Sequence, residues 1–223
     1  MHSHHHHSES GEASAKETQG LILNNGWLYD LKVWFFDTFV FRGKVREIRQ
    51  RTIDLARIQP GEKVLDVGCG TGTLAIEVQQ RVGETGRVFG IDPGTQQIAR
   101  ARSKASRRNL PAVFQIGVIE HLDFPDRTFD VVLSTFMMHH LPDDLKRLGL
   151  SEVARVLKPG GRLVIVDFKR PEERENPPGR FGAMEIGFQD LPALVKEAGF
   201  SQVETEEMRL PRTEIGFIRA LKS

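Results

Sequence analysis

The chain has 223 residues, and its 31 lysines and arginines nearly balance 30 aspartates and glutamates, giving a formal net charge of +1. This length suits one domain with a buried core, and the balanced charge argues against the global positive field of a nucleic-acid-binding protein. The lone cysteine, Cys69, excludes an internal disulfide, and no uncharged apolar run reaches the roughly 18 residues that suggest a transmembrane helix, so we expect a cytoplasmic protein without nucleic-acid partners.

The first twenty residues carry no pattern of a folded element. The histidine run in residues 1–7 is typical of a purification tag, and the stretch that follows to residue 20 is polar and rich in serine and glutamate. We therefore expect a tag and disordered leader over 1–20 and a single domain over 21–223. Within that domain we predict a helical cap over 21–58 and a core over 59–223.

An aromatic segment opens the domain. Residues 27–41 are WLYDLKVWFFDTFVF, which predicts a helix that is apolar on most faces, and residues 44–58 predict a second, more basic helix. Three interpretations of the first helix stay open. It could pack against a sheet edge, form a lid over the cofactor with an apolar acceptor pocket that includes Trp27 and Trp34, or attach shallowly to a membrane surface. Membrane attachment would be aided by the basic residues of the second helix, which are Lys44, Arg46, Arg49 and Arg51.

From residue 63 onward, short apolar runs alternate with amphipathic segments. The apolar runs predict strands over 63–67, 87–91, 112–116, 129–134, 162–168, 202–206 and 214–221. The amphipathic segments predict helices over 73–81, 96–107, 143–157 and 191–198. This alternation indicates βαβ units, and right-handed crossovers then favour a Rossmann-like, doubly wound α/β sheet that is covered on both faces.

The first predicted strand runs into a glycine-rich turn, VLDVGCGTG over 64–72, and a helix follows at once. This arrangement is typical of nucleotide-type cofactor sites, because glycines let the backbone approach a ligand closely. A dinucleotide loop would have glycine at position 73, where this chain has Thr73. Asp66 would also oppose a pyrophosphate, whereas it suits a ligand that carries sulfonium and ammonium groups. The loop therefore favours S-adenosylmethionine over a nicotinamide or flavin cofactor, and a turn without a ligand is the remaining alternative.

Two residues beside this turn have more than one interpretation. Asp92 closes the second predicted strand, where a carboxylate can accept both hydroxyls of a ribose, and its alternative is an ordinary N-cap for the helix after Pro93. Cys69 could be a reactive thiol near a helix N-terminus. We prefer the interpretation that Cys69 is a small residue that fits a tight turn.

Four segments, taken in order, resemble the class I S-adenosylmethionine-dependent methyltransferases, and among them the ubiquinone/menaquinone-type group. They are VLDVGCGTG, VFGIDPG, FDVVLSTFMMHHLPDD and ARVLKPGGRLVIVDF. The resemblance implies a seven-stranded sheet whose last strand is antiparallel. It also implies that Asp66, Gly68 and Gly70 contact the methionine part of the cofactor, that Asp92 holds the ribose and that Tyr29 covers the cofactor. The other expected cofactor contacts are Cys69, Pro93, Gln97, Gly117, Val118, Ile119 and Ser134.

The chain departs from this group at two positions near the expected adenine pocket. The group often has an aspartate after the third strand, where this chain has Val118, and an apolar residue where this chain has Gln97. The backbone of Val118 and Ile119 could contact the adenine instead, or Glu120 could substitute for the missing carboxylate.

We expect the acceptor site after the fourth predicted strand, because ligands of open α/β sheets lie outside the carboxyl ends of the strands. By the resemblance, Ser134 lines the methionine end and His139 lies nearer the acceptor. His139 or His140 could act as a general base if the acceptor must lose a proton, or both could simply pack and cap the helix start at Pro142. The expected acceptor contacts are Trp27, Trp34, Met138, His139 and Phe181. No cluster of histidine, cysteine and aspartate has metal-ligand spacing, so we predict no metal.

The sequence thus predicts an enzyme that moves a methyl group from S-adenosylmethionine to a small, apolar or aromatic acceptor. The methylated atom and the oligomeric state stay open. One alternative is a cofactor-binding protein of the same fold with a non-methylating role, and a second is a nicotinamide oxidoreductase.

Overall fold

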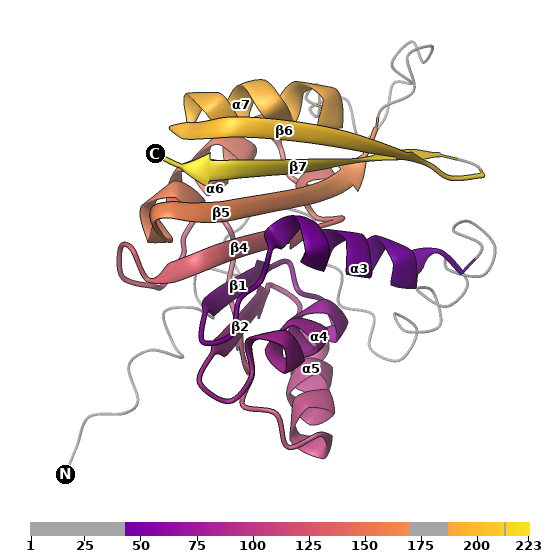
Figure 1. Cartoon of the computed structure of the whole chain (residues 1–223), viewed down its shortest axis with the longest axis vertical. Helices are drawn as coiled ribbons and strands as arrows, with labels where there is room; N and C mark the ends of the chain where they lie inside the picture. Colours follow the sequence, from indigo (N-terminus) through magenta and orange to yellow (C-terminus); the bar gives the residue numbers. More distant parts are fainter. Residues whose placement is uncertain (1–42, 170–186, 212) are drawn as a thin grey trace.

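A computed structural model describes residues 43–169, 187–211 and 213–223 (Figure 1). The predicted tag, leader and aromatic helix lie outside these residues, and so do the predicted site residues Trp27, Tyr29, Trp34 and Phe181. The expectations that concern them stay predictions.

Seven strands form one sheet in the order β3-β2-β1-β4-β5-β7-β6. In chain order they are β1 (Lys63–Val67), β2 (Arg87–Asp92), β3 (Val113–Ile116), β4 (Phe129–Thr135), β5 (Leu157–Phe168), β6 (Phe200–Arg209) and β7 (Glu214–Lys222). All pairs among β1 to β5 are parallel, whereas β7 runs antiparallel to both β5 and β6. The predicted Rossmann-like sheet with an antiparallel last strand is confirmed.

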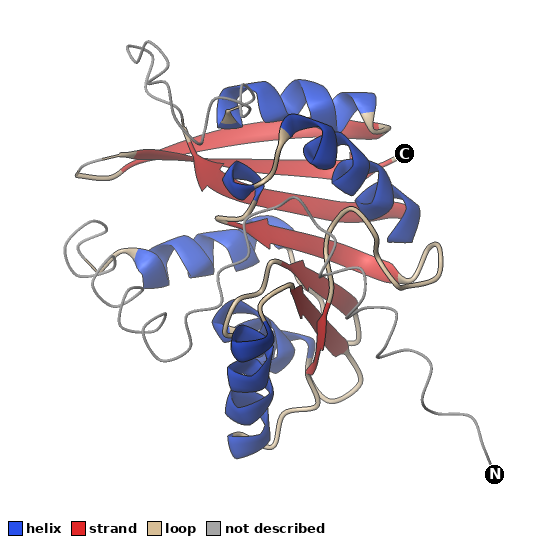
Figure 2. Cartoon of the chain, turned by 180° about the vertical axis from the view of Figure 1, so that it is seen from behind, coloured by secondary structure: helices blue, strands red, loops and turns tan. Residues whose placement is uncertain are grey.

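Helices cover both faces of this sheet, as Figures 1 and 2 show from opposite sides. They are α3 (Val45–Ala56), α4 (Thr73–Val82), α5 (Thr95–Arg107), α6 (Asp143–Val156) and α7 (Leu191–Glu197). One core cluster joins the sheet to α3, α4 and α5 through residues such as Ile48, Leu74 and Ile98. The other joins it to α6 and α7 through residues such as Leu150 and Leu194. The sheet is therefore doubly wound, as the alternating pattern predicted.

The chain changes direction across the sheet between β1 and β4. It builds outward from β1 through β2 and β3, and then returns to add β4 and β5 on the other side of β1. The loops that leave the carboxyl ends of β1 and β4 therefore lead to opposite sides of the sheet. In open α/β folds, this switch point is where ligands bind.

Helix α3 corresponds to the basic helix predicted after the aromatic segment. Arg49 donates a hydrogen bond of 2.9 Å to Glu77, and Arg51 pairs with Glu206. Lys44 also lies 3.3 Å from Glu47, so three of the four basic residues that could attract a membrane surface are paired within the protein. Among the residues that the structure describes, no helix is both long and apolar enough to cross a bilayer.

The predicted bounds fail most at β5 and β6. β5 starts at Leu157 and not at the predicted residue 162, because Pro159 and the two glycines after it form a bulge inside the strand, where the ladder jumps from the Phe129–Leu157 pair to the Val131–Arg162 pair. Gly160 supports this bulge with a φ of 72°. β6 extends beyond the predicted 202–206 in both directions, because pairing with β7 carries its polar residues into the ladder. Two short 3₁₀ helices, η2 (Met138–His140) and η3 (Phe188–Asp190), were not predicted.

Candidate functional site

The glycine-rich turn joins β1 to α4 at the switch point. Gly68, Gly70 and Gly72 all have positive φ, at 72°, 52° and 74°, a conformation that side chains with a Cβ rarely adopt. A Cβ on Gly68 would lie 2.4 Å from the Met137 side chain, and one on Gly72 would lie 2.8 Å from the Phe114 ring. The turn thus needs glycine for both its backbone angles and its packing.

Hydrogen bonds hold the turn in place from two sides. The N–H groups of Gly68 and Cys69 both donate to the carbonyl of Ile91 on β2, at 2.9 Å each. The Lys104 ammonium on α5 donates to the hydroxyl of Thr71 at 2.7 Å and lies 3.5 Å from the hydroxyl of Thr73. The loop is therefore fixed before any ligand arrives, which reduces the entropy that binding would cost.

Asp66 is the most unusual group at this edge. Its side chain is only 1% exposed, and neither carboxylate oxygen has a hydrogen-bond partner in the described part of the chain. Burial, and then the nearby charge of Asp92, raise the pKa of Asp66 to about 8, although the approaching N–H of Ala75 opposes the rise without reaching hydrogen-bond geometry. A buried carboxyl without a partner is unfavourable, so this position is arranged for a cationic or hydrogen-bond-donating ligand.

Asp92 lies at the end of β2 and faces the same turn. Its carboxylate accepts the N–H of Gly70 at 2.9 Å through Oδ2 and the N–H of Gly94 at 2.8 Å through Oδ1. Burial raises the pKa of Asp92, and these two hydrogen bonds only partly oppose that rise. The N-cap of α5 is Gly94, so the ordinary N-cap interpretation of Asp92 does not hold. Each oxygen keeps a further lone pair for hydroxyl donors.

Cys69 packs in a confined space next to β2. A Cβ on Gly90 would approach its sulfur to 2.9 Å. Burial raises the pKa of the Cys69 thiol well above its ordinary range, and the charges of Asp66 and Asp92 raise it further. The geometry supports the interpretation of Cys69 as a small packing residue over that of a reactive thiolate.

Two more buried polar groups, Gln97 and Ser134, have no partner among the described residues. The Ser134 hydroxyl lies at the end of β4, in register with Val67 on β1, and the Gln97 carboxamide belongs to the first turn of α5. Together with Asp66, they place three buried groups without hydrogen bonds on elements that meet at the carboxyl edge of the sheet. Native interiors rarely leave such groups unpaired, so their concentration here marks a ligand site.

The segment after β3 carries the other predicted cofactor contacts. The N–H of Gly117 donates to the Asp92 carbonyl at 3.3 Å, which holds this loop beside the end of β2, where Pro93 follows Asp92. Val118 and Ile119 are buried, and Val118 forms an isolated antiparallel bridge with His121. The loop therefore offers no carboxylate at position 118, and its Ile119 side chain packs against Gly149 of α6.

On the acceptor side, His139 is held by Asp167, a residue that the sequence did not point to. Asp167 is buried at the end of β5. Its Oδ1 lies 2.6 Å from His139 Nδ1, and its Oδ2 accepts the backbone N–H of His139 at 3.0 Å. The carboxylate thus fixes both the backbone and the ring, and it favours the tautomer with hydrogen on Nδ1 and a free lone pair on Nε2.

The two candidate bases, His139 and His140, have different surroundings in the structure. The His139 side chain is 33% exposed, and its ring stacks at 3.9 Å between centroids on His140 and contacts Phe168 edge-on. Burial, followed by the charge of His139, lowers the pKa of His140 to about 4. Met138, an expected acceptor contact, is 1% exposed and lies in the core cluster beneath these rings.

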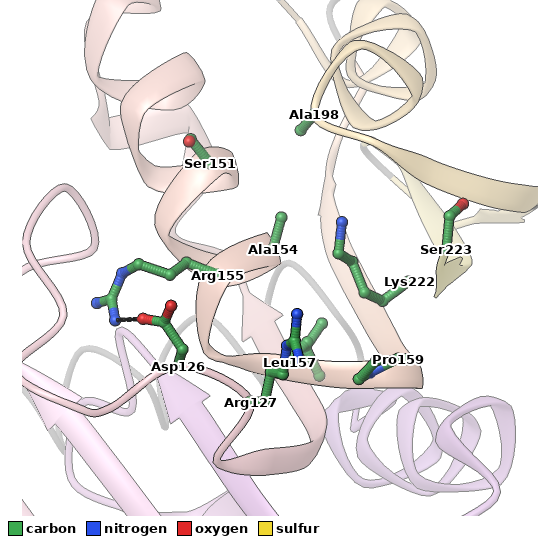
Figure 3. Close-up of a pocket in the computed structure, with 10 residues that line it drawn as sticks. All are labelled: Asp126, Arg127, Ser151, Ala154, Arg155, Leu157, Pro159, Ala198, Lys222 and Ser223. Atoms are coloured by element: carbon green, nitrogen blue, oxygen red, sulfur yellow. Dashed lines mark hydrogen bonds and ion pairs between the residues drawn. The ribbon is translucent and has the colours of Figure 1, made fainter.

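A separate cavity of about 450 Å³ lies at the opposite, amino edge of the sheet (Figure 3). Its lining includes Arg155 from α6, Leu157 at the start of β5 and Lys222 at the end of β7. Arg155 already donates to Asp126 and to Glu152, both at 2.8 Å. This cavity shares no residue with the glycine turn or with the His139–Asp167 pair. No group of three or more potential metal ligands occurs in the described ranges.

Comparisons with known proteins place this geometry in context. Residues 64–161 match a family described as "Methyltransferase domain". The ubiquinone/menaquinone biosynthesis C-methyltransferase of Haemophilus ducreyi is 35% identical over 160 residues, which cover 70% of this chain and 60% of that relative. The chain therefore spans less than two thirds of the length of this curated relative.

Two solved structures share the fold. A SAM-dependent methyltransferase from Aquifex aeolicus superposes with a TM-score of 0.64 at 24% identity, over 78% of this chain and 89% of that chain. A (4+2) cyclase, SpnF, superposes with a TM-score of 0.68 at 20% identity, over 79% of this chain and 80% of that chain. The glycine turn, the buried acids and the sheet order all lie within the matched residues or the shared fold.

Proposed function

We propose that this chain is a class I S-adenosylmethionine-dependent methyltransferase and that it methylates a small, apolar or aromatic acceptor. The observation that carries the proposal is the buried, unpaired carboxylate of Asp66 beside a rigid glycine turn. The relative from Haemophilus ducreyi bears a name that places its chemistry on quinones. An apolar or aromatic acceptor for this chain is consistent with that name.

The residues present fit this cofactor. Asp66 would face its cationic methionine part, Asp92 has lone pairs for the two ribose hydroxyls, and Ser134 would add a hydroxyl at the methionine end. When bound, the cofactor supplies a methyl group on a sulfonium, which is already a good leaving group. Much of the work of the protein is then to bind, orient and exclude water.

His139 is the residue that we propose to hold the proton of the acceptor. Its Nε2 accepts the proton that an acceptor O–H, N–H or acidic C–H loses as the new bond to the methyl group forms. Asp167 keeps Nδ1 protonated and stabilises the imidazolium that results, because its oxygen lies 2.6 Å from that nitrogen. We assign no proton transfer to His140, because a pKa of about 4 makes it a weak base.

The proposal is tested by incubating the purified chain with methyl-labelled S-adenosylmethionine and a panel of phenols, quinols, amines and thiols. A cell extract is added as a further, untargeted source of acceptors. We expect label in a small apolar or aromatic product, which mass spectrometry identifies. Cofactor binding without labelling of any class would contradict methyl transfer, and binding of NAD without binding of S-adenosylmethionine would contradict the cofactor.

A non-methylating role is the second candidate, because the same fold occurs in a chain that is described as a (4+2) cyclase. The His139–Asp167 pair favours methyl transfer over this candidate, since a base that is oriented toward a reacting acceptor has a direct use there. The two are separated by the fate of the cofactor. Methyl transfer produces one S-adenosylhomocysteine per product molecule, and a non-methylating reaction leaves the cofactor unchanged.

A further inference from the structure

Gln97 is an expected cofactor contact, but nothing described so far says what its buried carboxamide would do there. It is 2% exposed, and neither its Nε2 nor its Oε1 has a hydrogen-bond partner among the described residues. Its neighbour Gln96 on the same helix is exposed. Burying an amide without a partner is unfavourable, because its hydrogen bonds to water are lost and not replaced. A buried position with two unpaired amide atoms therefore calls for a ligand with both a donor and an acceptor.

The position of Gln97 relates it to the cofactor site. Gln97 lies in the first turn of α5, five residues after Asp92, and α5 begins at Gly94, whose N–H is bound by the Asp92 carboxylate. Side chains on a helix tilt toward its N-terminus. The carboxamide therefore leans toward the carboxyl end of β2, on the side of α5 that packs on β2 and β3.

The loop after β3 offers no carboxylate at position 118 to read a base. Val118 is buried, the Ile119 side chain packs against Gly149 of α6, and the backbone N–H of Gly117 is used by the Asp92 carbonyl. Adenine has an exocyclic amine that donates, with an acceptor ring nitrogen on either side of it. A carboxamide matches that pair, because its oxygen accepts from the amine while its nitrogen donates to the ring nitrogen.

We infer that Gln97 reads the adenine edge of S-adenosylmethionine with its carboxamide, and so sets the base specificity of the cofactor site. This inference rests on the proposed function, because it presumes that the site holds this cofactor. It assigns Gln97 a binding role and not a catalytic one. It also predicts that the preference for adenine depends on a helix side chain rather than on an acid after β3.

The test compares S-adenosylhomocysteine with its 6-deamino analogue, in which hydrogen replaces the exocyclic amine, by calorimetric titration of the intact chain. In the unsubstituted protein we expect the analogue to bind about tenfold or more weakly, because the oxygen of Gln97 is then left buried without a donor. In Gln97→Met we expect the two ligands to bind within about twofold of each other, with S-adenosylhomocysteine weakened by about tenfold. Gln96→Met is the matched control, and it should keep the full preference.

The outcomes distinguish this inference from the proposed function. If the unsubstituted protein binds neither ligand, the proposed function fails. If it binds both equally, or if Gln97→Met keeps the preference, the inference fails while the proposed function stands. Should Gln97→Met not fold, Gln97→Leu and the ratio of affinities in the unsubstituted protein still decide. A melting temperature of Gln97→Met equal to or above that of the parent, without ligand, is the expected sign that the amide serves binding and not folding.

Discussion

Polar side chains at the amino edge of the sheet are paired, whereas several at the carboxyl edge have no partner among the described residues, although both sets lie on the same strands. At the amino edge, the Asp130 carboxylate on β4 accepts the Lys63 N–H at 2.9 Å and the Lys158 ammonium at 2.6 Å. Arg162 on β5 binds Glu62 at 2.6 Å. At the carboxyl edge, Asp66 on β1 and the Ser134 hydroxyl on β4 have no hydrogen-bond partner among the described residues.

The pKa values of Asp130 and Asp66 differ in the same way between the two edges. Burial alone would raise the pKa of Asp130, but the hydrogen bonds from Lys158 and Lys63 outweigh it, and the pKa falls below its ordinary value. Burial, and then the nearby charge of Asp92, raise the pKa of Asp66 to about 8, and no cation among the described residues offsets this rise. Polar groups at the amino edge thus pair with one another and stabilise the fold, whereas Asp66 and Ser134 at the carboxyl edge remain available to bind a ligand.

The largest expected effect comes from the His139–Asp167 pair at the carboxyl edge. We expect His139→Ala to lower kcat by roughly 10²- to 10⁴-fold, the usual contribution of a general base, with a smaller change in KM. Asp167→Asn should also lower kcat and change the pH profile of kcat, since the ring loses its orienting carboxylate. Steady-state kinetics over pH 5–9 measures both effects.

His140→Asn is the control variant for His139→Ala. We expect it to lower kcat far less than His139→Ala does, because His140 is not the group that takes the proton. Equal losses for the two variants would contradict the assignment of the base to His139.

The next effect is a dependence of stability on pH at the same edge. Between its unfolded pKa near 3.8 and its folded pKa of about 8, Asp66 binds more protons in the folded state than in the unfolded state. The free energy of unfolding without ligand should therefore fall as pH rises through this window, by up to about 1.4 kcal/mol per pH unit from this group. Asp92, whose pKa is also raised, acts in the same direction.

Urea unfolding at several pH values between 5 and 9 measures this slope. Asp66→Asn removes the titrating group, so its slope should be shallower and its stability at pH 9 higher than that of the parent. Identical slopes for the two proteins would show that Asp66 ionises normally in the folded state.

The smallest of these effects concerns the amino edge and should have the opposite character. Arg162 donates to Glu62 and also, at 2.7 Å, to the Ala56 carbonyl at the end of α3. Arg162→Met should lower the free energy of unfolding by roughly 1–3 kcal/mol, because Glu62 loses its cation and keeps only the Gln59 N–H, and the Ala56 carbonyl loses the Arg162 donor. Cofactor affinity, measured by calorimetry, should change by less than about twofold. A large loss of cofactor affinity in Arg162→Met would contradict the account in which the amino edge serves stability and not binding.

Much of the fold could be predicted from the sequence because local pattern and tertiary structure agree there. β1 ends and α4 begins on either side of the run of glycines, and both elements start at the predicted residue. β6 could not be bounded, because an edge strand rich in glutamate has no apolar face and is defined only by its pairing with β7. The bulge at Gly160 could not be predicted either, because its composition is that of an ordinary turn.

The glycine turn could be predicted because its residues follow one another between β1 and α4, and the roles of the expected cofactor contacts stay predictions. The partnership of Asp167 with His139 could not be predicted, because it spans 28 residues and joins the end of β5 to η2, which follows β4. A polar residue that closes the apolar run of β5 was the available signal. Gln97 was visible as a departure from a family pattern, but only its burial without a partner gives it a role.

The contrast between the edges is tested most directly by binding S-adenosylmethionine to a matched pair of variants, Asp66→Asn and Asp130→Asn, alongside the parent. Both changes replace one strand carboxylate by its amide. We predict that calorimetry shows a loss of affinity of roughly 10- to 100-fold for Asp66→Asn, the value of a charge-assisted interaction, and less than about twofold for Asp130→Asn. Equal affinities for the two variants, or no binding by the parent, would contradict a carboxyl edge arranged for this cofactor.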